Sequence, residues 1–197
     1  MQRMHGYMTE LWQRHYGRYF GQCNLNLGCA GNKEPGFVNL DKNPAVNPDV
    51  VHDMEVLPLP FADNTFDCVF GSHVFEHIER KHFLPLVAEI NRILKPGGCL
   101  IGITPYGTNF AAWEAPQHLM LFSEATWMYC IPEIYEGENT AGYRADQGDP
   151  LGRWEVMEQT LVPFAEFEDD PEIEFKRKHW NNVIREIHCV LRKREKP

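Results

Sequence analysis

The segment from residue 66 to residue 103 most restricts the fold of this chain. Phe66–Phe70 is a continuous apolar run bounded by turn residues, which is typical of a strand buried on both faces. Residues 82–94 then place apolar side chains at the i, i+3, i+4 and i+7 spacing of an amphipathic helix, and Cys99–Ile103 is a second apolar run. Because strand, helix and strand follow in this order, they predict a parallel sheet with a crossover helix.

Weaker patterns extend this sheet on both sides. We expect three short strands before it, one helix at the start of the chain and two late strands that form an antiparallel edge. These elements cover residues 23–27, 36–41 and 49–53 for the early strands, 4–20 for the helix, and 152–164 and 183–191 for the late strands. The fold class is therefore α/β, with a Rossmann-like, mostly parallel sheet flanked by helices and an antiparallel C-terminal edge. We expect one domain over residues 1–197, with an N-terminal helix in residues 1–21 and a substrate-facing segment with a loop insertion in residues 105–152.

Small or acidic residues follow four consecutive strands of the expected sheet. The first strand ends on a glycine turn, Gly28 to Gly31, the next two end on Asp41 and Asp53, and the fourth ends on Gly71-Ser72-His73. Open α/β sheets bind ligands outside the carboxyl ends of their strands. The four strand ends together therefore predict a ligand site.

The link between Gly28 and Asp41 restricts the kind of ligand. Only 13 positions separate the two residues, and Pro35-Gly36 interrupts them, so a full crossover helix does not fit. A pyrophosphate would then lack the helix N-terminus that usually binds it. The spacing favours a nucleoside cofactor without phosphates.

Several segments resemble class I S-adenosylmethionine-dependent methyltransferases, most closely the small type 11 branch. The resemblance starts with Leu25–Asn32 and Pro35–Asp41 and continues, in the family's order, through later segments. These are His52-Asp53 and residues 59–67, 72–77 and 94–98. The resemblance spans residues 23 to 104 and, less specifically, 118–123, and it implies S-adenosylmethionine as the cofactor.

The resemblance also implies roles for the residues at the strand ends. The glycine turn would let the backbone approach the methionine part of the cofactor, and Asp41 would accept hydrogen bonds from the ribose hydroxyls. Asp53 and Met54 would contact the adenine. Ser72 and His73 would line the floor of the pocket beside the methyl group. The implied cofactor-binding residues are Leu27, Gly28, Cys29, Ala30, Gly31, Asp41, Lys42, Asp53, Met54, Ser72 and His73. Ala30 departs from the family, which often has glycine there, and alanine is unstrained only if its φ is negative.

The acceptor side is less well defined by the sequence. His118 lies beyond the expected fifth strand, where a substrate-facing segment belongs, and is the candidate catalytic base for an oxygen acceptor; alternatively, it fixes the loop through a hydrogen bond. Tyr106, Phe110 and Trp113 either line a substrate pocket or pack in the core. We expect methyl transfer to a small molecule, with O-methylation as the commonest outcome, but the sequence does not identify the substrate.

Two other functions fit parts of the sequence. His73, Glu76 and His77 match the H-x-x-E-H pattern of a zinc hydrolase, and His82 or Cys68 is an available third ligand. We nevertheless expect no metal, because this run directly follows a buried strand, where the methyltransferase family carries it. The second alternative is a non-catalytic S-adenosylmethionine-binding module, which Ala30 and the weakly patterned residues 132–152 favour.

Composition restricts the partners and the compartment. A net charge of -9 disfavours nucleic acid as a partner. Six scattered cysteines without a C-x-x-C pair indicate a reducing compartment. No stretch has the apolar length of a signal-peptide core or a membrane span, so we expect a cytoplasmic protein without a membrane partner. The sequence does not indicate the oligomeric state.

Overall fold

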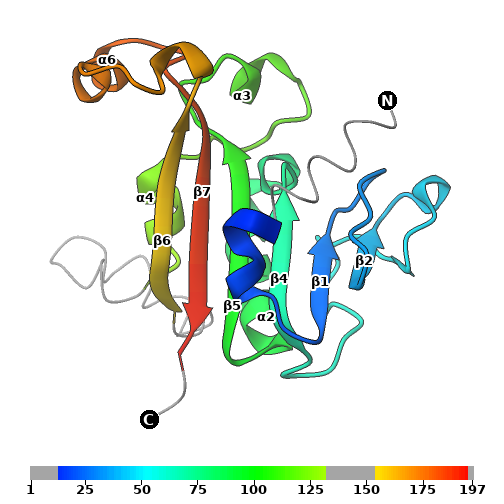
Figure 1. Ribbon diagram of the computed structural model, residues 1–197. Coiled ribbons are helices and arrows are strands. Elements are labelled where there is room, and N and C mark those ends of the chain that lie inside the picture. Colours follow the sequence, from blue (N-terminus) through cyan, green and yellow to red (C-terminus); the bar gives the residue numbers. More distant parts are fainter. Residues whose placement is uncertain (1–12, 132–153, 195–197) are drawn as a thin grey trace, which may run out of the picture.

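The computed structural model describes residues 13–131 and 154–194, and its strands form one mixed sheet (Figure 1). The strand order is β3-β2-β1-β4-β5-β7-β6. The strands are β1 (Asn24–Leu27), β2 (Phe37–Asp41), β3 (Val50–Val51), β4 (Phe66–Ser72), β5 (Leu94–Pro105), β6 (Trp154–Pro163) and β7 (Ile184–Lys193). The first five strands pair in parallel, while β7 is antiparallel to both β5 and β6. The predicted α/β fold with an antiparallel C-terminal edge is confirmed.

Helices cover both faces of this sheet and part of its upper end (Figure 1). They are α2 (Arg80–Ile93), α3 (Ala111–Glu114), α4 (Glu124–Met128) and α6 (Ile173–His179), with 3₁₀ turns η1 (Gly17–Tyr19), η2 (Pro44–Val46), η3 (Phe75–His77) and η5 (Ala165–Phe167). Of the N-terminal helix expected over residues 4–20, residues 13–16 are helical and η1 follows, while residues 4–12 lie outside the described part. The loop expected over 132–152 also lies outside it. The sequence analysis did not predict α3 or α6.

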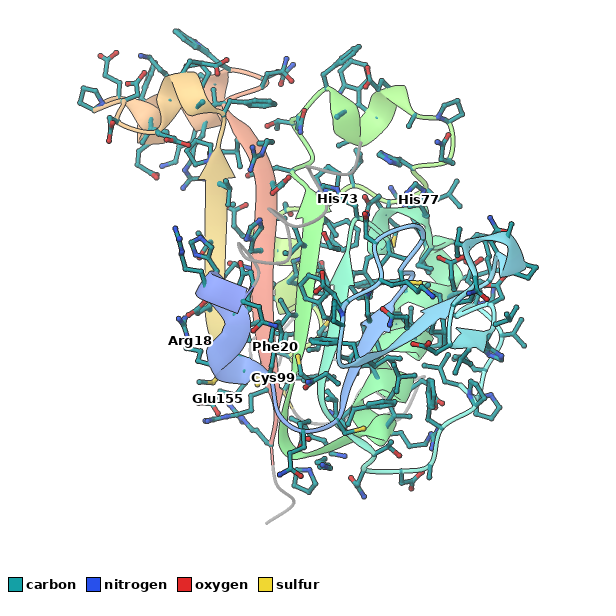
Figure 2. All side chains as sticks on the ribbon, turned by 45° about the vertical axis from the view of Figure 1, so that its right-hand side comes forward. Arg18, Phe20, His73, His77, Cys99 and Glu155 are labelled. Atoms are coloured by element: carbon teal, nitrogen blue, oxygen red, sulfur yellow. The ribbon has the colours of Figure 1, made fainter. Side chains whose placement is uncertain are left out.

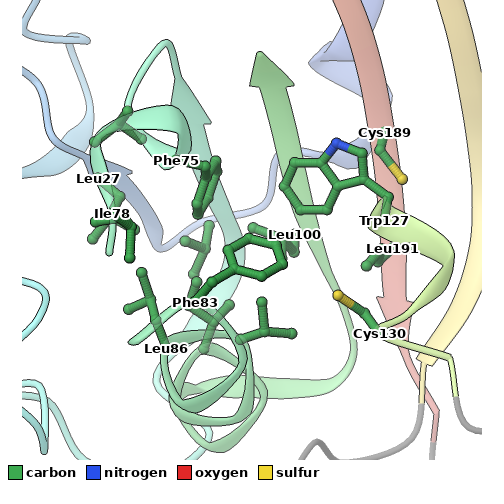
Figure 3. Packing of buried hydrophobic residues seen from close by; sticks show 14 of the residues in the cluster. Leu27, Phe75, Ile78, Phe83, Leu86, Leu100, Trp127, Cys130, Cys189 and Leu191 are labelled. Atoms are coloured by element: carbon green, nitrogen blue, oxygen red, sulfur yellow. The ribbon is translucent and has the colours of Figure 1, made fainter. Parts of the chain in front are cut away.

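The central strands are buried on both faces, as their continuous apolar runs predict. Val69 and Leu100 face a core that α2 and α4 cover, and the alternate residues Cys68 and Phe70 face a second cluster that contains Tyr16 of the N-terminal segment. In the first core, rings of η3, α2 and α4 meet edge to face (Figure 3), and the centroids of Phe75, Phe83 and Trp127 are 5.3–6.4 Å apart. The close packing of these rings against β5 fixes where the chain after β4 can run.

The connection between β1 and β2 forms turns rather than a helix, as the short spacing predicts. Two buried asparagines hold it. The Asn26 side chain donates to the Asn32 carbonyl at 2.9 Å and to Oδ1 of Asn39 at 3.0 Å. Asn39 Oδ1 also accepts from the Glu34 amide at 2.8 Å, and its Nδ2 donates to Asp49 at 2.9 Å. These bonds satisfy backbone groups that a helix would otherwise pair, and so fix the glycine turn without one.

Candidate functional site

The carboxyl ends of β1, β2, β3 and β4 lie at one edge of the sheet, the upper end in Figure 1. Leu27 of β1 pairs with Leu40 of β2, and Asp41 at the end of β2 pairs with Val51 at the end of β3. Ser72 ends β4 beside Ile103 of β5. The structure therefore brings together the strand ends that the sequence analysis singled out.

The segments that follow β1, β3 and β4 contact one another at Gly28. Its φ is 66°, in the left-handed region that favours glycine. A Cβ at this position would lie 2.3 Å from Cγ2 of Val74 and 3.2 Å from Cε of Met54. The glycine turn, the loop after β3 and the segment after β4 therefore pack directly against one another, and only glycine leaves room for this contact.

Asp41 is held by the backbone of the turns around it. Its Oδ2 accepts from the Ala30 amide and its Oδ1 accepts from the Asn43 amide, both at 2.8 Å. A carboxylate oxygen has more than one acceptor position, so each oxygen can accept a further hydrogen bond. Asp41 is thus an oriented acceptor of two hydrogen bonds beside the glycine turn.

Ala30 has a φ of 44°, although alanine is unstrained only at negative φ. The left-handed conformation costs a residue with a Cβ about 1–2 kcal/mol. In this strained conformation the Ala30 amide donates its hydrogen bond to Asp41. The residue that departs from the family's glycine therefore sits in the conformation that favours glycine.

Asp53 and Met54 follow β3, the strand that neighbours the Asp41 strand β2 on the side away from β1. The Asp53 carboxylate accepts from the Glu55 amide at 3.1 Å, and its Oδ2 lies 3.8 Å from Nζ of Lys42. Both of these charged side chains reach solvent, so the ion pair contributes little to stability. Met54, by contrast, is buried, with its methyl group close to Gly28.

His73 lies at the end of β4 between two carboxylates, at the same end of the sheet as His77 (Figure 2). Its Nε2 is 3.3 Å from Glu186, and its Nδ1 is 3.5 Å from Oε1 of Glu76. Burial lowers the pKa of His73, but the hydrogen bonds to Glu186 and Glu76 outweigh this effect and raise it to about 9. His73 is therefore an imidazolium at neutral pH, and its backbone has a φ of 52°.

Glu186 is the residue of this site that the sequence analysis missed. It lies on β7, where it accepts from His73 and, through Oε2, contacts Nε2 of His188 at 3.0 Å. Nδ1 of His188 in turn contacts the hydroxyl of Tyr16. Burial raises the pKa of Glu186, but hydrogen bonds from His188 and His73 lower it well below the usual range. The only available signal was a charged residue within the late strand expected over residues 183–191.

His118 is attached to the same region by backbone hydrogen bonds. The carbonyl of Glu76 accepts from the amides of Leu119 and Met120 at 2.7 and 3.1 Å. This places the His118 ring against His77, with the two ring centroids 4.7 Å apart. Nδ1 of His118 is 3.2 Å from the carbonyl of Ala112, so the predicted loop-fixing hydrogen bond is present.

Comparisons with known proteins agree with this geometry. A family model for a methyltransferase domain, of type 11, matches residues 25–102. Residues 25–102 are therefore a methyltransferase domain, and together with the shared fold they indicate a class I S-adenosylmethionine-dependent methyltransferase. Its cofactor is S-adenosylmethionine. No curated protein sequence matches the chain.

Solved structures share the fold of this methyltransferase at low sequence identity. A SAM-dependent methyltransferase from Archaeoglobus fulgidus is 16% identical, with a TM-score of 0.66 over 96% of this chain and 94% of that one. A second SAM-dependent methyltransferase, from Mesorhizobium loti, is also 16% identical, with a TM-score of 0.51 over 89% and 92%. The cyclase SpnF is 14% identical, with a TM-score of 0.62 over 96% and 82%. Since SpnF is named a cyclase, the fold alone does not specify the reaction.

The zinc-hydrolase alternative requires His73 and His77 on one face of a helix, and this expected geometry is wrong. His73 has a positive φ, and the next residues form the 3₁₀ turn η3 rather than an α-helix. His73 points instead to Glu186 and Glu76. Cys68 lies in the buried cluster beneath the sheet. Glu76 and His77, however, do approach a second histidine, which is His118.

The aromatic residues after β5 of the methyltransferase have different roles. Tyr106 is buried, and its hydroxyl donates a hydrogen bond to Glu124 at 2.8 Å, so this residue packs in the core. Phe110 and Trp113 are about half exposed (49% and 54%) and meet edge to face with centroids 4.8 Å apart. A shallow hollow of about 380 Å³ adjoins Phe110; it is lined by Asn109, Phe110, Ala111, Phe164, Glu166 and Asn182.

Proposed function

We propose that this methyltransferase transfers the methyl group of S-adenosylmethionine to an oxygen atom of a small-molecule acceptor. The contact of the glycine turn with Met54 and Val74 around Gly28, beside the oriented carboxylate of Asp41, carries the cofactor part of the proposal. This arrangement offers a backbone approach, a bidentate acceptor and an apolar wall within one edge of the sheet. A nucleoside with a methionine tail needs these three features.

We assign the cofactor contacts to the strand ends. The backbone of the glycine turn approaches the methionine part, Asp41 accepts from the ribose hydroxyls, and Asp53 and Met54 contact the adenine. The proposed residues are Leu27, Gly28, Cys29, Ala30, Gly31, Asp41, Lys42, Asp53, Met54, Ser72 and His73. Supporting this assignment, the carboxylates of Asp41 and Asp53 are both accessible and both held by backbone amides.

The acceptor is proposed to bind beside His118 and the exposed aromatic pair of Phe110 and Trp113. Because the carbonyl of Ala112 accepts from Nδ1 of His118, Nε2 is the nitrogen that remains to take a proton. In the transfer, the C–S bond of the sulfonium breaks as the C–O bond forms, and S-adenosylhomocysteine leaves. In the metal-free protein, the proton of the acceptor hydroxyl goes to Nε2 of His118.

The charge of the region favours a neutral or cationic acceptor over a nucleic acid. The net charge is -9, and Glu166 lines the hollow beside Phe110, while the cation of His73 is balanced by Glu76 and Glu186. Anionic polymers are repelled by such a surface. Small molecules with a hydroxyl group are therefore the acceptors to test first.

We also propose that the protein acts in a reducing compartment. All six cysteines are free thiols, and five of them are buried. Free, buried cysteines are typical of proteins in the cytoplasm. None of the helices in the described parts of the chain has the length and apolar character that crossing a bilayer needs.

Replacing Asp41 or Asp53 with alanine tests the assigned pocket. Each of these variants should bind S-adenosylmethionine at least about tenfold more weakly, because a hydrogen bond to a charged acceptor contributes about 1.5–3 kcal/mol. Calorimetric titration gives the affinity, and the unfolding temperature of each variant shows whether the fold is kept. Asp169→Ala, at an exposed position away from the strand ends, is the matched control and should leave the affinity unchanged. Unchanged affinity in both pocket variants would contradict the assignment.

A methyl-release assay over a panel of hydroxyl-bearing small molecules separates an enzyme from a binding module. Formation of S-adenosylhomocysteine that depends on one acceptor supports catalysis. Tight cofactor binding without turnover on any acceptor supports the non-catalytic alternative.

A further inference from the structure

Three potential metal ligands converge next to the proposed acceptor position. They are Glu76 and His77 of η3 and His118 of the segment after α3. One ligand atom from each side chain lies within 4.8 Å of the other two. The convergence depends on the bonds from Leu119 and Met120 to the Glu76 carbonyl, which join the two segments.

Both imidazoles are held in the tautomer that binds a metal through Nε2. Nδ1 of His77 is 3.1 Å from the carbonyl of Gln117, and Nδ1 of His118 is 3.2 Å from the carbonyl of Ala112. A carbonyl oxygen can only accept, so each Nδ1 carries the proton and each Nε2 keeps a lone pair. Metal-binding histidines are typically oriented by such a hydrogen bond from the other ring nitrogen.

Glu76 supplies an independent observation that points to a cation ligand. The residue is only 2% exposed, yet no described residue forms a hydrogen bond with its Oε2. The other oxygen, Oε1, faces His73 at 3.5 Å. A buried polar atom without a partner costs about 1–3 kcal/mol, and more when it is charged. A bound cation would remove this cost.

We propose that Glu76, His77 and His118 bind one divalent transition-metal ion. Two imidazoles and one carboxylate suit Zn²⁺, Fe²⁺, Mn²⁺ or Co²⁺, whereas Ca²⁺ and Mg²⁺ prefer oxygen ligands. Ligand atoms about 2.0–2.2 Å from the ion would lie about 3–3.5 Å apart, so atoms that are now up to 4.8 Å apart must approach by up to about 1.3–1.8 Å. His73 is not a ligand, because Glu186 and Glu76 occupy both of its ring nitrogens.

Such a site leaves coordination positions open on the acceptor side. A hydroxyl oxygen bound there would have a lowered pKa and would lose its proton to water, while Nε2 of His118 stays on the metal. This role in activating the acceptor rests on the proposed function. Metal binding itself rests on the three side chains alone.

Titration of the full chain with Co²⁺ or Zn²⁺ tests the site. The protein should carry no polyhistidine tag and be treated first with a chelator. We expect one equivalent of metal, with Co²⁺ producing a visible absorption band. Glu76→Gln, His77→Ala and His118→Ala should each weaken binding at least about tenfold, since each removes one of three ligands. Glu76→Gln keeps the size of the buried side chain and so guards against loss of the fold. His179→Ala, which removes an exposed histidine from α6, should bind metal as the wild type does.

Absence of stoichiometric binding by the wild type would overturn the proposal, as would wild-type affinity in all three variants. Calorimetry with S-adenosylmethionine on the same samples keeps the two proposals apart. Metal binding without cofactor binding would refute the proposed function and support the metal site. Cofactor binding without metal binding would overturn the metal site and leave the assigned cofactor pocket standing.

Discussion

Gly28→Ala is expected to destabilise the protein by about 2–4 kcal/mol and to weaken cofactor binding at least about tenfold. Two effects add at this position. The φ of 66° is unfavourable for alanine, and the new Cβ would lie 2.3 Å from Val74. Relief of the clash requires the glycine turn or the segment after β4 to move, and both belong to the proposed pocket. Chemical denaturation measures the stability, and calorimetry measures the affinity for S-adenosylmethionine.

Gly31→Ala is the matched control for the stability effect. It makes the same substitution three residues later in the same turn, where a Cβ would meet no atom within 4 Å. Its stability should stay within about 0.5 kcal/mol of the wild type. Equal stability of the two variants would show that the contact of Gly28 with Val74 and Met54 does not exist in the protein.

His118→Ala is expected to lower turnover by a factor of about 10²–10⁴ while changing the affinity for S-adenosylmethionine little. The side chain lies on the acceptor side of the site, beyond the strand ends that are proposed to bind the cofactor. Its loss therefore removes proton transfer, or a metal ligand, without removing a cofactor contact. The measurement is kcat for the best acceptor across roughly pH 6 to 9, with His179→Ala as the control.

The two roles of His118 differ in their metal dependence. In a chelator-treated wild type, turnover that persists and follows the protonation of one group supports His118 as the base. Turnover that disappears with the chelator and returns with Zn²⁺ or Mn²⁺ supports its role as a ligand. If His118→Ala turns over as the wild type does at every pH, His118 has neither role in catalysis.

The fold could be predicted where local pattern and burial agree. The apolar runs of β4 and β5 and the apolar stripe of α2 predicted those elements within a few residues, although β5 starts at Leu94 rather than Cys99. The expected strand over residues 49–53 shrinks to Val50–Val51. The His52 amide still bonds the Asp41 carbonyl of β2, but Asp53 already belongs to a turn, in which its side chain accepts from the Glu55 amide and its carbonyl accepts from the Val56 amide. The short α6, with its exposed Phe175, has no strong apolar stripe from which it could have been predicted.

The site could be predicted only as far as strand order determines it. Parallel pairing brings Asp41 to the end of β3 and Gly28 beside the segment after β4, so neighbouring strand ends were sufficient evidence. The ion pair of His73 with Glu186 depends instead on the register of β5 with β7, 113 residues later in the chain (186 minus 73). The approach of His118 to Glu76 and His77 depends on two long-range backbone bonds to one carbonyl. Neither contact leaves a periodic signal in the sequence.

A crystal structure of the full chain with S-adenosylhomocysteine tests the central claim most directly. The account predicts the ribose hydroxyls on the carboxylate of Asp41, the adenine beside Asp53 and Met54, and the homocysteine tail along the turn from Leu27 to Gly31. The sulfur should point toward Ser72, His73 and the segment that carries His118. A nucleoside bound away from these strand ends, or no bound ligand at a saturating concentration, would contradict the account.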